Sequence, residues 1–197
     1  MIKFIKENIN INDVDYISGG ERRDWFFSNI IANKLGKSHI TIYKDLELVV
    51  NDSTFENEID KANVSGAKVL HIADLITEAS SYIRAWIPAV ESLGAKINWS
   101  TVVVDRMQGG CEKLAEHNVK SLSIIRIDEG LFKNALDMNI INEPQYEMLK
   151  NFYENPDATM RNFLISHPEF LDNALKSDEK TAARARLCID NNLYNLK

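Results

Sequence analysis

The stretch of residues 68–94 changes its hydrophobic period once, and this change constrains the fold more than any other feature of the sequence. Residues 69–76 form an apolar run that only His71 and Asp74 interrupt, as expected of a buried strand in a parallel sheet. From Thr77 onward the apolar residues recur at helical spacing, and a glycine follows the last turn. The stretch therefore predicts a strand, a tight turn and a helix with Thr77 as its N-cap.

The predicted turn at residues 77–81 lies at the carboxyl end of a strand, where open parallel sheets bind ligands. The first N–H groups of a helix have no acceptor within the helix, and the helix dipole favours a negative charge beside them. We therefore expect this turn to bind an anion.

Strand and helix patterns alternate along the chain up to residue 127, after a short leading segment over residues 1–12. Strands are expected over residues 13–18, 39–44, 97–105 and 122–127, with residues 46–50 pairing as a hairpin. A helical stripe follows the first strand and consists of Trp25, Phe26, Ile30, Ile31 and Leu35. Repeated strand–helix units of this length predict a Rossmann-like α/β fold, a parallel sheet with helices on both faces.

From Asp128 the strand patterns stop and the sequence becomes helical. Helices are expected over residues 129–138, 143–153, 157–165 and 178–193, with a shorter turn at residues 170–171. We therefore divide the chain into an α/β core over residues 1–127 and a helical C-terminal extension over residues 128–197, packed on the core.

The composition disfavours several classes of function. The chain of 197 residues has a net charge of −6 and no basic stripe, which disfavours nucleic-acid binding. No apolar run approaches the roughly 20 residues of a membrane span, and the polar first residues do not resemble a signal peptide. Cys111 and Cys188 have no metal-site spacing, so we expect reduced thiols and a cytoplasmic location.

A second candidate ligand loop, residues 19–24, follows the first strand. Gly19 and Gly20 would let the backbone approach a ligand closely, and Arg22 and Arg23 could each hold phosphate oxygens in a bidentate way. The alternative is an ordinary glycine turn whose arginines pair with neighbouring acids or with solvent.

The turn after the central strand resembles the phosphoribosyl pyrophosphate loop of type I phosphoribosyltransferases. That loop reads as apolar residues, two acids, two variable residues, Thr-Thr-Gly, one further residue, and Ser or Thr. The chain reads Ala-Asp-Leu-Ile-Thr-Glu-Ala-Ser-Ser over residues 73–81. The matching positions are Asp74, Thr77 and Ser81, and the departures are Ala73 for an acid, Glu78 for Thr and Ala79 for Gly.

A second segment, residues 101–119, resembles orotate phosphoribosyltransferases within the same family. It reads as an apolar strand, Asp105-Arg106, one residue, Gln108-Gly109-Gly110 and a helix, and it lies about one strand–helix unit downstream, as in that family. The resemblance covers roughly residues 13–127.

The resemblance implies an enzyme, a pentosyltransferase that transfers phosphoribosyl from phosphoribosyl pyrophosphate to orotate in pyrimidine nucleotide synthesis. It assigns Asp74 to the ribose hydroxyls and the 77–81 turn to the 5′-phosphate, with Asp74 and Lys44 as catalytic residues. The residues implied for phosphoribosyl pyrophosphate are Asp74, Thr77, Glu78, Ala79, Ser80, Ser81, Gly19, Gly20, Arg22, Arg23 and Lys44. Those implied for the base are Asp105, Arg106, Gln108 and Gly109, with Arg106 as the partner of orotate's oxygens.

The resemblance also implies Mg²⁺ and a homodimer. It assigns the metal no protein ligand beyond a contact with Asp74 through water.

Two departures leave other functions open. Glu78 is predicted at or near the first helical position, where it would repel a bound phosphate by about 4 kcal/mol at an effective dielectric near 20. We therefore hypothesise that its carboxylate occupies the phosphate position. Residues 46–53 also lack the Lys, His and Gly of the family's mobile closing loop.

The alternative function is a catalytically degenerate homologue that binds a nucleoside or an unphosphorylated sugar in the same cleft. A third candidate is an assembly protein whose helical tail docks a partner.

Overall fold

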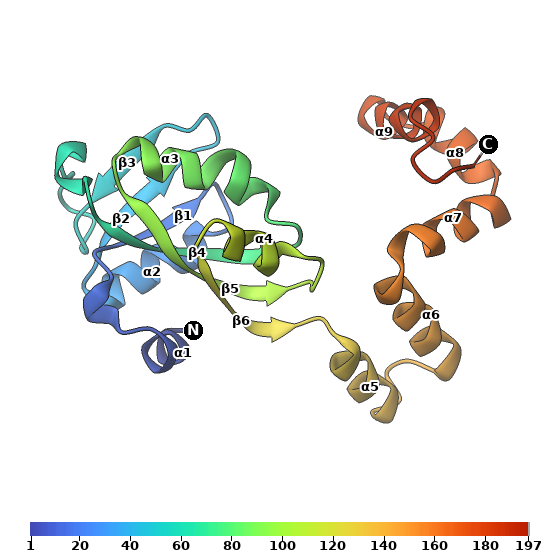
Figure 1. Cartoon of the computed structure of the whole chain (residues 1–197), viewed down its shortest axis with the longest axis horizontal. Coiled ribbons are helices and arrows are strands. Elements are labelled where there is room, and N and C mark those ends of the chain that lie inside the picture. Colours follow the sequence, from blue (N-terminus) through green and yellow to red (C-terminus); the bar gives the residue numbers. More distant parts are fainter. Residues whose placement is uncertain (197) are drawn as a thin grey trace. The chain divides into compact units, whose positions relative to one another are not determined.

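Six strands form one sheet in the order β3-β2-β1-β4-β5-β6 (Figure 1). The computed structural model describes residues 1–196. The strands are β1 (Tyr16–Gly20), β2 (Ser38–Ile42), β3 (Leu48–Asn51), β4 (Lys68–Ile76), β5 (Lys96–Asp105) and β6 (Lys120–Arg126). Every neighbouring pair is parallel except β2 and β3, which form the predicted antiparallel hairpin. The predicted parallel α/β sheet is therefore confirmed.

Helices cover both faces of this sheet. They are α1 (Ile2–Asn8), α2 (Trp25–Leu35), the π-helical turn η3 (Tyr82–Trp86) with α3 (Ile87–Ser92), and α4 (Gly110–Glu116), besides the short 3-10 turns η1 (Ile11–Asp13) and η2 (Lys61–Val64). The alternation of β4 builds both cores, because successive strand side chains point to opposite faces. Val69 and Ala73 pack in one cluster with η3, α3 and α4, whereas Leu70 and Ile72 pack in the other with α1 and α2.

The N-terminal residues form part of the second cluster rather than a loose leading segment. Ile5 of α1 and Ile9 after it are buried. Asn10 caps η1 by accepting a hydrogen bond from Asn12 N–H, so β1 begins at Tyr16 and not at Asp13.

The buried face of α2 differs from the predicted stripe. Phe26 and Ile30 are 70% and 60% exposed, whereas Ser28, Ile31 and Ala32 face the sheet. The polar Ser28 is accommodated there because its hydroxyl lies 2.9 Å from Nε2 of the buried His39. A pattern read from hydrophobicity alone could not place a serine in the core.

A second compact unit begins at Asp128. It contains α5 (Glu129–Asp137), α6 (Glu143–Glu154), α7 (Pro156–Ser166), α8 (Glu169–Leu175) and α9 (Glu179–Asp190). The side chains of Asp128, Asn142, Asn155 and Asp178 cap α5, α6, α7 and α9. The predicted helices are present, and α8 replaces the predicted turn. Among residues 1–196, no helix combines the length and apolar content that a membrane span requires.

Replacing Ile5 by alanine tests the packing of α1. Ile5→Ala should lower the free energy of unfolding by about 2–5 kcal/mol, because it leaves a cavity in a fully buried site. Lys3→Ala, on the exposed side of the same helix, should change it by less than about 0.5 kcal/mol. Urea denaturation of both variants measures the difference, and equal losses would contradict the packing of α1 on the sheet.

Candidate functional site

A cavity opens where β1 and β4 separate. These two strands are the neighbours at which the strand order reverses, since β1 continues to β2 and β4 continues to β5. Their pairing ends at Ser18 and His71. Beyond that point a cavity of about 250 Å³ lies between the loop after β1 and the turn after β4. Open α/β sheets bind ligands at this position.

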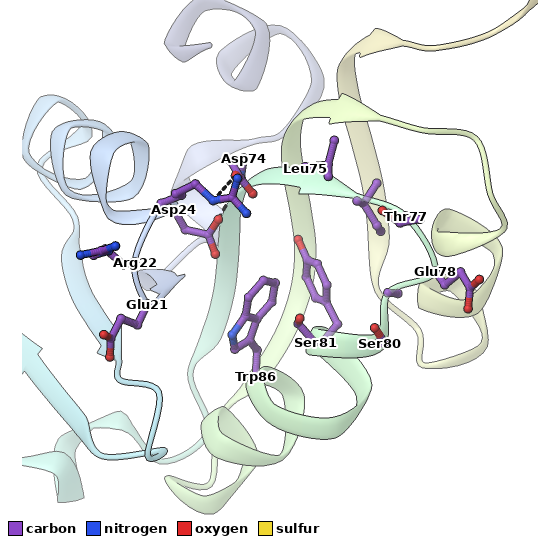
Figure 2. A pocket seen from close by; sticks show the side chains of 14 residues that line it. Glu21, Arg22, Asp24, Asp74, Leu75, Thr77, Glu78, Ser80, Ser81 and Trp86 are labelled. Atoms are coloured by element: carbon purple, nitrogen blue, oxygen red, sulfur yellow. Dashed lines mark hydrogen bonds and ion pairs between the residues drawn. The ribbon is translucent and has the colours of Figure 1, made fainter. Parts of the chain in front are cut away.

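The lining brings together most of the residues predicted to bind phosphoribosyl pyrophosphate (Figure 2). They are Arg22, Arg23, Asp74, Thr77, Glu78, Ala79, Ser80 and Ser81. The cavity is also lined by residues for which the sequence predicted no ligand role, namely Glu21, Asp24, Tyr82 and Trp86. Gly19, Gly20, Lys44, Asp105, Arg106, Gln108 and Gly109 are not among its lining residues.

The turn of residues 77–81 presents backbone donors. The helix begins at Ser80 and not after Thr77, so the predicted N-cap is wrong. The cause is Ala79, whose φ of 55° lies in the left-handed region and delays the helix. Within residues 1–196, the N–H groups of residues 78–81 donate no hydrogen bond to another group. They are therefore available to an anion in the cavity.

The Glu78 side chain does not occupy the phosphate position. Its carboxylate forms an ion pair with Lys113 of α4, with 3.5 Å between Oε2 and Nζ, and the side chain is 64% exposed. Figure 2 shows it directed away from Trp86 and the other side chains of the cavity. Because the helix starts after Glu78, this residue is not at the first helical position, and the hypothesis of an occupied cradle is wrong.

Gly19 and Gly20 make room for the protein's own side chains rather than for a ligand. Both lie in β1. A Cβ at Gly20 would overlap the indole ring of Trp86, and a Cβ at Gly19 would overlap Ser28. The predicted close approach of backbone is therefore real, but the groups that approach are Trp86 and Ser28.

The two arginines after β1 have different partners. Arg23 Nε lies 3.2 Å from Asp74 Oδ2, so Arg23 pairs across the cavity rather than with Glu21 or Asp24. Arg22 forms no ion pair with any residue among 1–196, and its peptide bond with Glu21 is cis. Both arginines are exposed, and Arg22 has no ion-pair partner in the described part of the chain that would compete for a ligand's phosphate oxygens.

Lys44 lies outside the cavity. It is exposed in the tight turn that joins β2 to β3, and its backbone N–H donates to Glu21 Oε2 at 2.8 Å. The segment after β3 is also held, because the Asp52 carboxylate accepts hydrogen bonds from Thr54, Glu56 and Asn57. Those bonds lower the pKa of Asp52 to about 2.

The Asp105 carboxylate organises the turn before α4. Asp105 is buried, with Oδ1 accepting from Met107 N–H at 2.8 Å and Oδ2 accepting from the Cys111 thiol at 3.1 Å. Neither oxygen is free to meet a base in this arrangement. Arg106 forms no ion pair with another described residue. Gln108 and Gly109 complete the turn before α4.

Gly110 lets that turn lie against the turn of residues 77–81. A Cβ there would lie 2.6 Å from the carbonyl oxygen of Thr77. The two motifs found in the sequence are therefore adjacent in space.

A network of buried polar side chains, which was not predicted from the sequence, lies beneath the cavity. Asp24 is 3% exposed and accepts from Asp74 N–H at 2.9 Å and from Gly20 N–H at 3.2 Å. His71 Nε2 lies 3.8 Å from Asp24 Oδ2, and its Nδ1 lies 2.9 Å from Ser18 Oγ. The His71 ring stacks on Trp86 with 4.5 Å between centroids. The only signal in the sequence was a histidine inside an apolar strand.

Burial determines the protonation states of Asp24 and His71. It raises the pKa of Asp24 to about 7, and the charge of Asp74 acts in the same direction, while the two backbone donors oppose it. Burial lowers the pKa of His71 to about 3. The ring is therefore neutral near pH 7, and its 3.8 Å approach to Asp24 is not an ion pair.

The carboxylates of the cavity suit a metal that arrives with its ligand. Among residues 1–196, no group of three His, Cys, Asp or Glu side chains could enclose a metal ion. Both Asp24 oxygens already accept hydrogen bonds, whereas Asp74 and Glu21 each have one oxygen without a hydrogen bond or ion pair among residues 1–196. Mg²⁺ is commonly held by one or two carboxylates together with substrate phosphates, so these residues fit that mode of binding.

Comparison with known proteins agrees with this geometry. The orotate phosphoribosyltransferase of Sulfurisphaera tokodaii is 29% identical over 71% of this chain and 68% of its own length. The adenine phosphoribosyltransferase of Symbiobacterium thermophilum is 30% identical over 55% of this chain and 70% of its own length. Alignments to several other orotate phosphoribosyltransferases span 46 to 51% of those proteins.

The fold has solved counterparts. The crystal structure of orotate phosphoribosyltransferase from Francisella tularensis superposes with a TM-score of 0.57 at 16% identity, over 78% of this chain and 74% of that one. At this identity the likeness concerns the fold alone. No protein-family model matches the chain.

The pKa of Asp24 predicts a pH dependence of stability. The folded pKa of about 7 lies above the ordinary 3.8, so this group stabilises the fold at low pH, and its contribution is lost as the pH rises through about 7. The loss is on the order of a few kcal/mol. His39 and His71 have lowered pKa values and act in the opposite sense below about pH 6.5.

The comparison is therefore between the wild-type protein and Asp24→Asn, with free energies of unfolding measured by urea from pH 4 to pH 8. We expect the wild type to lose stability relative to the variant as the pH rises. A constant difference across this range would contradict the raised pKa.

The contact between Gly20 and Trp86 predicts a coupling. Gly20→Ala should destabilise the protein by about 1–3 kcal/mol, because the new methyl group overlaps the indole ring. The same substitution in a Trp86→Ala background should cost much less. A double-mutant cycle by urea denaturation measures the coupling, and additive effects would mean that the two residues do not oppose each other.

Proposed function

Because the chain belongs to the type I phosphoribosyltransferase family, we propose that it transfers the phosphoribosyl group of phosphoribosyl pyrophosphate to orotate. The observation that carries the proposal is the content of one cavity. The Asp74 carboxylate, the N–H groups of residues 78–81 and the two arginines after β1 converge there. Each suits a different part of the same phosphorylated sugar.

The proposed reaction needs positioning more than acid–base chemistry. The bond from the ribose carbon to pyrophosphate breaks, the bond to the base nitrogen forms, and positive charge develops on the ribose between these events. Asp74 would hold the ribose hydroxyls, and the 77–81 turn would hold the 5′-phosphate by its N–H groups. Arg22 and Arg23 would take the departing pyrophosphate, whose charge they offset.

Arg106 supports orotate rather than adenine as the acceptor base. Its guanidinium has no ion-pair partner among residues 1–196, and it follows a strand end that Gly110 holds beside the turn of residues 77–81. Orotate carries a carboxylate that a guanidinium can bind in a bidentate way, and adenine does not. Relatives of both kinds align with this chain, so the support for orotate comes from this side chain.

We further propose that Mg²⁺ enters with the pyrophosphate, because the cavity offers Asp74 and Glu21 but no enclosed set of metal ligands. When bound, the ion would neutralise pyrophosphate charge. The apolar surface of Phe26 and Ile30 supports a homodimer, and the free thiols of Cys111 and Cys188 support a cytoplasmic location.

One observation favours the alternative of a homologue that binds a ligand without turnover. Lys44 lies in a tight hairpin turn outside the cavity. The segment after β3 is held by hydrogen bonds from Glu56 and Asn57 to the Asp52 carboxylate. A closing loop that carries a lysine to the reacting atoms is therefore not evident in residues 43–60. Turnover separates the two functions.

The direct test follows the loss of orotate absorbance with phosphoribosyl pyrophosphate and Mg²⁺. We expect turnover, and Asp74→Ala and Arg106→Ala should each lower kcat/KM by about 100-fold or more, since each removes a charged contact to the substrate. Arg161→Ala in the second unit is the matched control and should leave kcat/KM unchanged. Turnover with adenine but not orotate would overturn the assigned base. Saturable nucleoside binding without turnover would favour the alternative.

A further inference from the structure

The separation of β1 and β4 leaves backbone groups without ladder partners. The two strands pair only from Tyr16 and Val69 to Ser18 and His71. Gly20 on β1 and Asp74 on β4 lie beyond this pairing, where each strand faces the cavity instead of its neighbour. A buried N–H group that lacks an acceptor is costly, so both groups need another partner.

The Asp24 carboxylate supplies both acceptors. Oδ2 accepts from Gly20 N–H at 3.2 Å, and Oδ1 accepts from Asp74 N–H at 2.9 Å. One side chain thus bridges the two diverging strand ends. Since Asp74 carries the carboxylate that lines the cavity, its position depends on a bond to a residue 50 positions earlier in the chain.

The groups around Asp24 offer little compensation for its charge. From β4 it faces the Asp74 carboxylate and the neutral ring of His71, and from η3 it faces the neutral phenol of Tyr82. The cations of its own loop, Arg22 and Arg23, are both exposed. The Arg23 guanidinium is committed to Asp74 and is largely exposed. Ionised Asp24 is therefore held chiefly by the two N–H donors.

We propose that Asp24 is a positioning residue, which ties the end of β1 to the end of β4 and thereby sets the Asp74 carboxylate for its ligand. The inference rests on the proposed function only in the choice of ligand, the ribose 5-phosphate part of the substrate. The bridge needs two acceptor oxygens on one side chain, and an amide offers one instead of two. Ligand affinity through Asp74 should then depend on the Asp24 side chain.

The experiment compares the wild type with Asp24→Asn by calorimetric titration of ribose 5-phosphate at pH 8. The variant should bind about tenfold more weakly, because one amide oxygen replaces the two acceptor oxygens that bridge the strand ends. Equal affinities of the two proteins would overturn the proposal.

Asp15→Asn is the matched control. Asp15 makes the same kind of bond at the opposite end of the same strand pair, since its carboxylate accepts from Lys68 N–H at 2.8 Å. Its replacement should leave the affinity unchanged. A loss of affinity in Asp15→Asn as large as the loss in Asp24→Asn would overturn the proposal, because the effect would then not be specific to the bridge beside the cavity.

Amide hydrogen exchange provides the second measurement. At pH 8 the Gly20 and Asp74 amides should be protected in the wild type, and at least one should exchange about tenfold faster in Asp24→Asn. Unchanged exchange rates at both amides would overturn the bridge even if binding changed. If the wild type binds no ribose 5-phosphate, the proposed function fails, and the exchange rates still decide whether Asp24 ties the strands.

Discussion

The divergence of β1 and β4 is the constraint on which the rest of the site depends. Two parallel strands that stop pairing at Ser18 and His71 open a gap, and everything near the gap must fill it or satisfy its backbone groups. Asp24 accepts from both strand ends, and Trp86 packs so close to Gly20 that no side chain fits there. The cavity is the part of the gap that these residues leave open.

The floor of the cavity combines aromatic packing with buried polar groups. His71 stacks on Trp86 and meets the edge of Tyr82, whose hydroxyl lies 2.6 Å from Ser100 Oγ. A neutral histidine in such a layer contributes packing area and one hydrogen bond without the cost of a buried charge. Apart from Asp24, the charged side chains of the site, such as Asp74 and Arg23, lie where solvent reaches them.

The hydrophobic pattern was sufficient to predict the strands, because the burial of a strand determines which of its residues are apolar. The prediction from hydrophobicity was wrong where polar side chains are buried. Ser28 faces the core because His39 meets its hydroxyl, so Phe26 was wrongly placed inward. It also failed for Gly19 and Gly20, whose neighbours Ser28 and Trp86 come from elsewhere in the chain. Asp24 was missed for the same reason, since its partner Asp74 is distant in sequence.

The departures in the turn of residues 77–81 have local structural accommodations. Glu78 would repel an anion if it faced the cavity, but Lys113 draws its carboxylate outward to α4, so the like charges are separated. Ala79 takes the left-handed conformation that a glycine would take more easily, at a cost of roughly 1–2 kcal/mol. That conformation keeps the helix from starting before Ser80, and the N–H groups of residues 78–81 have no acceptor among residues 1–196. The turn therefore presents these donors although it contains Glu78 and Ala79.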